Sequence, residues 1–461
     1  MATELRPYPA YKDSGLPWLG SVPERWEVVA PKRMLQSRSA GAAPIKNTAS
    51  PEPRASYVPA FSASGQDVWL PSPMFHGPGL VLSAVGARCG KTFKADGAWA
   101  IVANTHVLMV RHSQNRDYWW YVTNNEAWWE RAGAAQPFVQ ISETLDRRWA
   151  VPPLPDQAAI VRYLDHADQK VRHAIRARQQ LIKLLTEQKQ AIIQRAVTRG
   201  LDPSVRLKPS GIPWLGDIPE HWTLKRFKFL TRIASGQVDP REPKNRGRIL
   251  IAPNHIESGT GRITHLETAQ EQGADSGKYE VHQGQIIYSK IRPNLCKAAI
   301  APMDCLCSAD MYPIGVRETE LRTAYVLRLL LSAPFTKYAV DCSLRVAMPK
   351  VNREALGECP LWYPNLEEQD AILQFLERAT SPLDVAIGAA RRGIDLLREY
   401  RTRLIADVVT GKLDVRDAAA HLPDEPEEQP EPLDEGPVAE TSDLDAEESD
   451  GDQSEDESRD A

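Results

Sequence analysis

Two stretches of the chain carry a hydrophobic stripe whose apolar positions recur at steps of three and four residues. This spacing is typical of helices that pack along a coiled-coil seam. The seam positions are Ile160, Leu164, Val171, Ile182, Leu185 and Ile192 in the first stretch, and Ile372, Leu376, Leu383, Ile394, Leu397 and Leu404 in the second. At ~1.5 Å per residue, each helix would extend about 65 Å. We expect the two helices to pair in an antiparallel coiled coil and to leave outer faces for other subunits.

Residues that favour or oppose helix mark the ends of both stretches. Gly200 and Gly411 stand where a helix C-cap is expected, because glycine adopts the left-handed conformation without strain. Pro382 lies inside the second stripe, and proline lacks the N–H group that a helix interior needs. We therefore expect the second helix to start as a short segment and to restart near Pro382.

The chain is an internal duplication. Residues 11–28 and 207–224 are identical at ten of 18 positions, at an offset of 196. Their shared glycines, prolines and indoles favour a surface turn that fixes where an element begins, and not a site of chemistry. The turn residues that we single out are Gly15, Pro17, Trp18 and Trp26 in the first copy, and Gly211, Pro213, Trp214 and Trp222 in the second.

The helical stretches are also copies of each other, at an offset of 212, so two repeated blocks bracket two divergent inserts. We expect an α+β protein with two α/β domains joined by long antiparallel helices, related by a pseudo-two-fold repeat. The boundaries that we predict are a turn with a first domain at 1–151, a helix block at 152–206, a turn with a second domain at 207–363, a helix block at 364–415 and an acidic disordered tail at 416–461.

Within the inserts, short apolar runs predict strands, and each is followed by a basic loop. Residues 285–289 and 79–83 match at an offset of 206, and residues 325–331 and 118–121 predict helices. Lys and Arg neutralise phosphates, and Arg or Asn contacts base edges, although a solvated charged loop is an equally good interpretation of any single residue. The candidate DNA-binding residues are Arg88, Lys91 and Lys94 in the first insert, and Asn254, His255, Lys290, Arg292, Asn294 and Lys297 in the second.

The net charge of −5 conceals two oppositely charged parts. Residues 421–461 hold 18 acidic side chains and one basic one, whereas residues 1–420 hold 55 basic and 43 acidic ones. A body with a net charge of +12 favours a polyanionic partner, and a block of like charge is typical of a solvated tail. The tail could also compete with DNA for the basic body.

The sequence provides no catalytic constellation and no recognisable metal site. Residues 86–92 resemble a phosphate-binding loop but are one residue short of the required spacing. The histidines are scattered, and Cys296, Cys305 and Cys307 lack the spacing of zinc ligands. We expect a binding protein, and keep as alternatives a self-contained DNA-acting enzyme and a coiled-coil scaffold without a DNA function.

Neither a membrane-spanning stretch nor a signal peptide is recognisable, and six cysteines are too few for a disulfide framework in a chain of 461 residues. These features predict a cytoplasmic protein that does not enter a membrane.

The doubled G-x-P-W-L-G-x-x-P-E-x-W turn, each copy followed by a variable insert and a helix block, resembles the specificity subunit of type I restriction–modification systems. The resemblance covers nearly all of residues 11–415. It implies two target recognition domains, each reading one half of a bipartite, asymmetric site in double-stranded DNA, with the helices as a spacer. It also implies two modification (methyltransferase) subunits and restriction (endonuclease and translocase) subunits as partners. S-adenosylmethionine, ATP and Mg²⁺ would belong to those partners, with no cofactor and no catalysis in this chain.

Overall fold

The computed structural model describes residues 5–39, 41, 43–111, 114–133, 136–343 and 349–423. These residues form two compact units, which we describe separately. Among the described residues, the first unit combines those up to 177 with 393–423, and the second consists of those between 178 and 392. The acidic stretch from 424 to 461 lies outside the described residues. Among the described helices, none is long and apolar enough to span a membrane.

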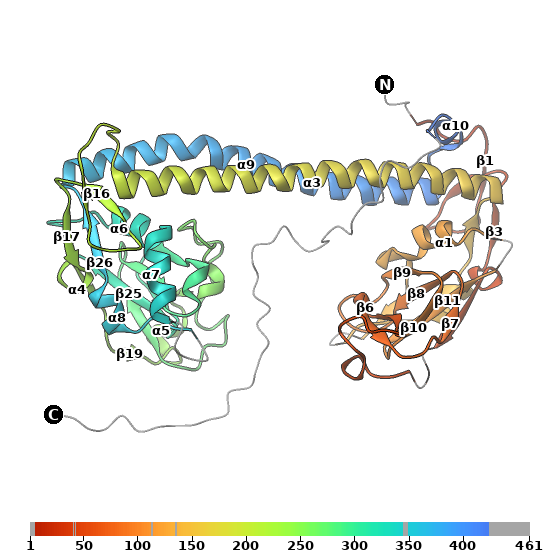
Figure 1. Ribbon diagram of the computed structural model, residues 1–461. Helices are drawn as coiled ribbons and strands as arrows, with labels where there is room; N and C mark the ends of the chain where they lie inside the picture. Colours follow the sequence, from red (N-terminus) through yellow and green to blue (C-terminus); the bar gives the residue numbers. More distant parts are fainter. Residues whose placement is uncertain are drawn as a thin grey trace. The chain divides into compact units, whose positions relative to one another are not determined.

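Two long helices, α3 (Leu154–Arg199) and α9 (Leu366–Val409), each contribute one half to each unit (Figure 1). In the first unit an ion pair joins Asp168 of α3 to Arg401 of α9. In the second unit Lys189 Nζ of α3 lies 2.6 Å from Asp384 Oδ1 of α9. Because residue numbers rise along one helix where they fall along the other, the pairing is antiparallel, as the sequence predicts.

The predicted seam residues lie on the packed side of both helices. Eight of the twelve are buried, and the other four, Leu185, Ile192, Leu383 and Leu397, are half-buried. The break predicted at Pro382 is wrong, because α9 continues through this residue. Pro382 is exposed, so water can reach the carbonyl group that loses its N–H donor.

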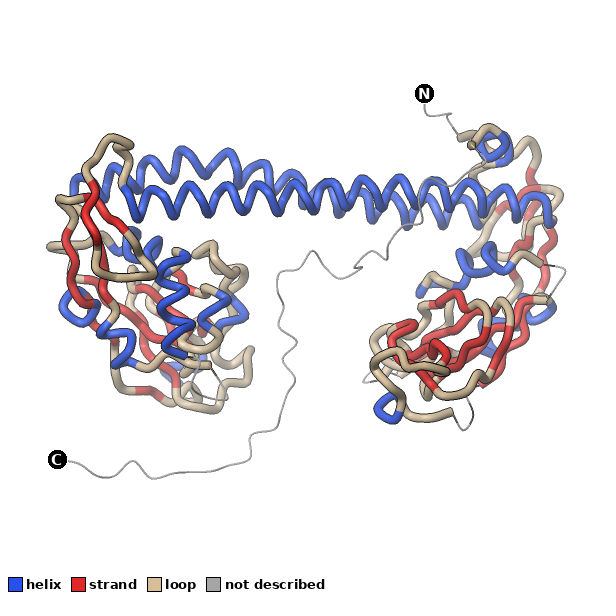
Figure 2. Tube along the Cα trace, viewed as in Figure 1, coloured by secondary structure: helices blue, strands red, loops and turns tan. Residues whose placement is uncertain are grey.

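The first unit contains two four-stranded sheets (Figure 2). One has the order β4 (Leu35–Ser39), β11 (Thr105–Val110), β8 (Gly79–Ser83), β9 (Thr92–Ala95), and the other the order β6 (Gly65–Leu70), β5 (Val58–Ser62), β10 (Ala98–Ile101), β7 (Phe75–His76). Helix α1 (Arg116–Thr123) confirms the helix predicted at residues 118–121, and it buries Tyr118, Trp119 and Tyr121. The unit also contains α2 (Ile141–Asp146) and the pair β12 (Arg131–Ala132) and β13 (Phe138–Val139).

The second unit repeats this plan. One sheet has the order β18 (Thr231–Ile233), β25 (Met311–Val316), β22 (Ile286–Ser289), β23 (Ala298–Ile300), and the other the order β19 (Gln237–Val238), β21 (Lys278–Val281), β24 (Cys305–Cys307), β20 (Leu250–Ile251). The helices are α4 (Phe227–Leu230), α5 (Pro243–Arg246), α6 (Thr323–Leu330), α7 (Ala333–Ser343) and α8 (Arg353–Glu358). The order β18-β25-β22-β23 matches the order β4-β11-β8-β9 of the first unit strand for strand. The other sheet of each unit contains one parallel pair, β5–β10 in the first unit and β20–β24 in the second. The offset of 206 therefore reflects a shared topology.

Each repeated turn is a hairpin, β1 (Tyr11–Asp13) with β2 (Ser21–Pro23) and β15 (Leu207–Pro209) with β16 (Asp217–Pro219). A further strand pair follows each hairpin and leads into a long helix, β3 (Glu27–Val29) with β14 (Trp149–Val151) and β17 (Thr223–Arg226) with β26 (Pro360–Tyr363). The two indoles of each turn differ in burial. Trp26 and Trp222 are fully buried, whereas Trp18 is 48% exposed and Trp214 is half-buried.

Each hairpin packs on the end of a long helix. Gly200 and Gly411 have φ angles of +71° and +79°, which confirms the predicted helix ends. Gly200 lies against Trp222 in the second unit, and Gly411 lies against Pro23 and Trp26 in the first. The first unit is therefore completed by the end of the last long helix.

The chain beyond Gly411 also belongs to the first unit. Asp414 forms a β-bridge with Arg6, and α10 (Arg416–Ala420) follows with Ala419 buried. The predicted disordered tail therefore begins too early in the sequence, because residues 416–420 are helical.

A buried glutamine near the start of each long helix holds the adjacent α/β domain in place. Gln157 Oε1 accepts a hydrogen bond from the N–H of Asn115, the residue that caps α1. Gln369 Oε1 accepts the corresponding bond from the N–H of Arg322, which precedes α6. Both side chains are fully buried, so the repeated glutamine joins each domain to its helix by the same contact.

Candidate nucleic-acid interface

A cleft of about 980 Å³ opens in the second unit between the long helices and the loops of its α/β domain. Six basic and three acidic side chains line it. The sequence analysis identified three of the lining residues, Asn254, Arg292 and Lys297, as DNA-binding candidates. The basic lining residues are Lys189, Arg262, Arg292, Lys297, Arg328 and Arg391, and the acidic ones are Glu257, Asp310 and Asp384. An excess of positive charge in a cleft favours an anionic ligand.

The loop between β22 and β23 supplies several of these residues. Its ends are joined by a hydrogen bond of 2.9 Å from the Ser289 N–H to the Lys297 carbonyl group. Arg292 and Cys296 have φ angles of +46° and +49°, a region that residues with a side chain rarely adopt. The N–H of Arg292 donates to the Pro349 carbonyl group, 3.0 Å away, which holds the backbone there. Such strain persists only where surrounding contacts impose it, and it is frequent at ligand-binding sites.

The remaining candidates of the second unit differ in exposure. Asn254, Arg292 and Asn294 are exposed, whereas only 9% of Lys297 is accessible. Lys290 is half-buried, with its Nζ 5.5 Å from the centre of the Tyr312 ring. The cleft therefore offers exposed polar groups at its edge and a largely covered cation, Lys297, in its wall.

His255 does not fit the predicted role of base reader. Its side chain is 1% exposed, so the ring presents no edge to a base in this structure. Burial, reinforced by the nearby His265, lowers the pKa of His255, while Glu267 acts in the opposite direction. His255 is therefore a neutral imidazole within the wall of the domain at neutral pH.

The first unit carries the corresponding loop between β8 and β9. A bond of 2.8 Å from the Ser83 N–H to the Lys91 carbonyl group matches the bond between Ser289 and Lys297. Arg88 is exposed on this loop, and Lys91 is half-buried. The two basic loops predicted from the sequence are therefore equivalent positions of one repeated fold.

Lys94 lies on β9, just beyond that loop. Its Nζ is 3.0 Å from Asp117 Oδ1 and 4.5 Å from the centre of the Trp120 ring. The charge of Lys94 is thus partly compensated within its own domain.

Sequence reasoning missed the basic residues that the helices bring to the cleft. Arg328 of α6 lines the cleft and makes no ion pair with any described residue. Burial lowers the pKa of Arg328, whereas the negative charges of Glu377 and Asp384 raise it by less. A lone arginine within the apolar run 325–331 was the available signal, because a charge inside a buried helix needs a partner.

Two contacts fix the α/β domain of the second unit to the helices beside the cleft. Arg391 Nη2 of α9 donates to Glu257 Oε1 at 3.0 Å, and Gln190 Nε2 of α3 donates to the Gly259 carbonyl group at 3.1 Å. Glu257 also accepts a bond of 2.9 Å from Arg262. These contacts offset the charges of Arg262 and Arg391, whereas the half-buried Arg328 has no ion pair among the described residues.

The described residues contain a repeated pair of domains, two long helices and two equivalent basic loops, and comparison with known proteins shows what this arrangement is similar to. Residues 219–385 match the family model described as "Type I restriction modification DNA specificity domain". The chain is 31% identical over 296 residues to the type I restriction enzyme EcoDI specificity subunit of Escherichia coli. That match covers 61% of this chain and 66%, just under two thirds, of the relative. These matches confirm the resemblance to type I restriction–modification specificity subunits that the doubled turn indicated.

Solved structures support the fold. A chain from a structure described as the "structural basis underlying complex assembly and conformational transition of the type I R-M system" aligns with a TM-score of 0.58 and 13% identity. The alignment covers 85% of this chain and 99% of that one. The HsdS subunit from Thermoanaerobacter tengcongensis aligns over 85% of this chain at 15% identity, with a TM-score of only 0.41. The α+β fold with its long helix pair is therefore shared with the chain of the type I R-M structure that aligns with a TM-score of 0.58.

Proposed function

We propose that this chain is the DNA-reading subunit of a type I restriction–modification complex and is not itself catalytic. Each recognition domain reads one half of a bipartite, asymmetric site in double-stranded DNA. The observation that carries this proposal is the pair of equivalent basic loops, 84–91 and 290–297, at the same strand ends of two domains with divergent sequences. Equivalent positions with different side chains favour two different half-sites.

We further propose that two modification subunits and restriction subunits assemble with the chain in the cytoplasm. S-adenosylmethionine would serve the modification subunits, and ATP with Mg²⁺ the restriction subunits. Exposed apolar side chains on the long helices, such as Leu184 and Leu396, support such docking, because the offset of 212 relates these two positions.

Methylation-aware sequencing of DNA from cells with and without this chain tests the proposal. The modification subunits are present in both cultures, so the chain is the only variable. We expect adenine methylation at a two-part, non-palindromic motif that disappears when the chain is absent. A palindromic motif would contradict the reading of two different half-sites, and methylation of DNA by the purified chain alone would contradict the non-catalytic role.

Replacing Arg328 with Gln should weaken DNA binding by the assembled complex and make the affinity less sensitive to salt. A cation that neutralises one phosphate contributes roughly −0.9 to the slope of log K against log salt concentration, so the slope should become shallower by about one. Fluorescence anisotropy with labelled duplex at several salt concentrations measures both effects.

The matched control is Arg378→Gln, which removes an exposed arginine of α9 outside the cleft lining. It should leave the slope within experimental error of the unmodified complex. Equal slopes for the two variants would show that Arg328 does not contact phosphate. Thermal unfolding of Arg328→Gln should be unchanged or slightly raised, because the substitution removes a partly buried charge.

A further inference from the structure

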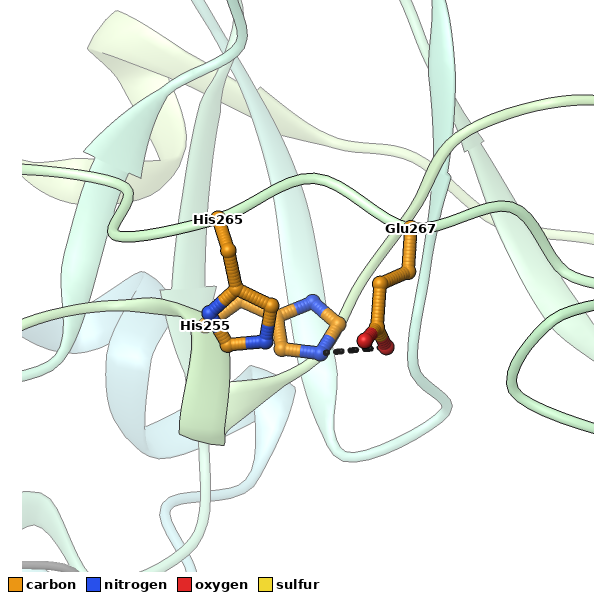
Figure 3. A group of neighbouring side chains, drawn as sticks. All are labelled: His255, His265 and Glu267. Carbon is orange, nitrogen blue, oxygen red and sulfur yellow. Dashed lines mark ion pairs between the residues drawn. The ribbon is translucent and has the colours of Figure 1, made fainter. Parts of the chain in front are cut away.

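Two imidazoles and a carboxylate converge in the second unit, beside the cleft (Figure 3). We propose that His255, His265 and Glu267 bind a divalent transition-metal ion of the zinc class. The sequence predicts no metal site, because the spacing of these residues corresponds to no known ligand pattern. The proposal concerns this domain alone and does not depend on the DNA-reading function.

The fold brings the three residues together through a folded-back loop. His255 ends the 3₁₀ turn η4 (Pro253–His255), and a β-bridge between Ile256 and Ile263 returns the chain to it. The N–H of Thr264 then donates to the His255 carbonyl group at 2.8 Å. As a result, the centres of the His255 and His265 rings lie 4.3 Å apart.

The ligand atoms are close enough for one ion to join them. One donor atom from each of the three residues lies within 4.8 Å of the other two. Zinc bonds of about 2.0–2.2 Å in a tetrahedral arrangement require ligand atoms roughly 3.3 Å apart. His255 is buried and fixed, whereas His265 is exposed and Glu267 is half-exposed. The two accessible side chains can therefore make the small closing movement.

The side chains of His255 and Glu267 are too far apart for a hydrogen bond to join them, because His255 Nε2 and Glu267 Oε2 are separated by 3.7 Å. His265 Nδ1 lies 3.0 Å from Thr264 Oγ1, a contact that orients the ring and leaves Nε2 for a metal. Two imidazoles with one carboxylate favour zinc, cobalt, nickel or copper over magnesium and calcium, which prefer oxygen ligands.

The geometry also indicates what the ion would do. It would fasten the loop 253–267 whose residues Asn254 and Thr264 line the cleft. Three protein ligands leave one tetrahedral position, and the exposure of His265 places that position within reach of solvent. The ion would therefore stabilise one wall of the cleft and carry an exchangeable water.

The test uses the full-length chain without an affinity tag, titrated with Zn²⁺ by calorimetry and with Co²⁺ by visible absorption. We expect one ion per chain, a tetrahedral Co²⁺ spectrum and a higher Tm in the presence of Zn²⁺. His265→Ala should weaken binding by about 100-fold or more and abolish the rise in Tm, because it removes one of only three ligands. Glu267→Gln keeps the size of the side chain but removes the carboxylate charge, and it should also weaken Zn²⁺ binding.

His282→Ala is the matched control, because His282 is 75% exposed in the same unit and outside the three-residue group. It should bind as the unmodified chain does. Since His265 is exposed, the His265→Ala chain should keep its metal-free Tm, which separates loss of the site from misfolding. Absence of Zn²⁺ binding by the unmodified chain, or equal binding by the His265→Ala and His282→Ala chains, would overturn the proposal.

Discussion

Replacing Trp26 with Ala is expected to lower the free energy of unfolding of the first unit by about 3–5 kcal/mol, the usual cost of truncating a large buried aromatic side chain. Trp26 is fully buried, its ring centre lies 5.7 Å from that of Tyr8, and it packs against Gly411 at the end of α9. The loss would therefore loosen the contact between the first hairpin and the last long helix. Hydrogen exchange in increasing urea, followed on peptides of residues 5–177, measures this change.

Trp18→Ala is the matched control within the same hairpin. Trp18 is 48% exposed and stacks on Trp149 with ring centres 5.5 Å apart, so its removal should cost only about 1 kcal/mol. Peptides of the second unit, residues 178–392, should keep their protection in both variants. Similar losses for Trp18→Ala and Trp26→Ala would show that burial does not distinguish the two repeated indoles.

Gly411→Ala should destabilise the first unit by about 2–5 kcal/mol. Its φ angle of +79° is unfavourable for alanine by roughly 1–2 kcal/mol. A methyl group there would also lie 2.5 Å from Pro23 Cδ and 2.7 Å from Pro23 Cγ. A proline ring cannot rotate away, so the backbone must shift, at a further cost of about 1–3 kcal/mol. The same exchange measurement on the first unit reports the loss.

Gly200→Ala provides the comparison at the equivalent position of the second unit. Its φ angle of +71° carries the same backbone penalty, but the nearest atom to the added methyl group is the flexible carboxylate oxygen of Glu368, at 3.0 Å. We expect a loss of only about 1–2 kcal/mol in the second unit. A loss at Gly200 as large as that at Gly411 would show that the contact with Pro23 adds nothing to the backbone strain.

Repetition made much of the architecture predictable. The hydrophobic seam, present in both copies, predicted the two long helices. The glycines at the helix ends were predicted correctly because glycine is the residue that adopts the left-handed conformation without strain. The offset of 206 paired the loops that end at Lys91 and Lys297, and the matching sheet orders confirm that pairing. Local periodicity and duplication are properties of the sequence itself, so no tertiary information was needed.

Features that depend on tertiary packing were missed. The helix continues through Pro382 because the packed seam supports it on the other side, and sequence alone cannot say which side faces solvent. Arg328 reaches the cleft only because α6 lies beside the long helices. His265 meets His255 through a loop closed by one β-bridge, between Ile256 and Ile263, and such a pairing leaves no periodic trace.

The first unit is built from both ends of the chain, and this arrangement dictates an order of events during synthesis. The second unit is one continuous stretch, residues 178–392, and can fold as soon as it leaves the ribosome. The helix end at Gly411 that covers Pro23 and Trp26 is translated only afterwards. At translation rates of about 5–20 residues per second, the first hairpin waits roughly 20–80 s for that cover. The unit whose synthesis begins first is therefore the last to be completed. A ribosome that stops between residues 392 and 411 releases a chain whose second unit is complete, whereas its first unit lacks the helix end that covers Pro23 and Trp26.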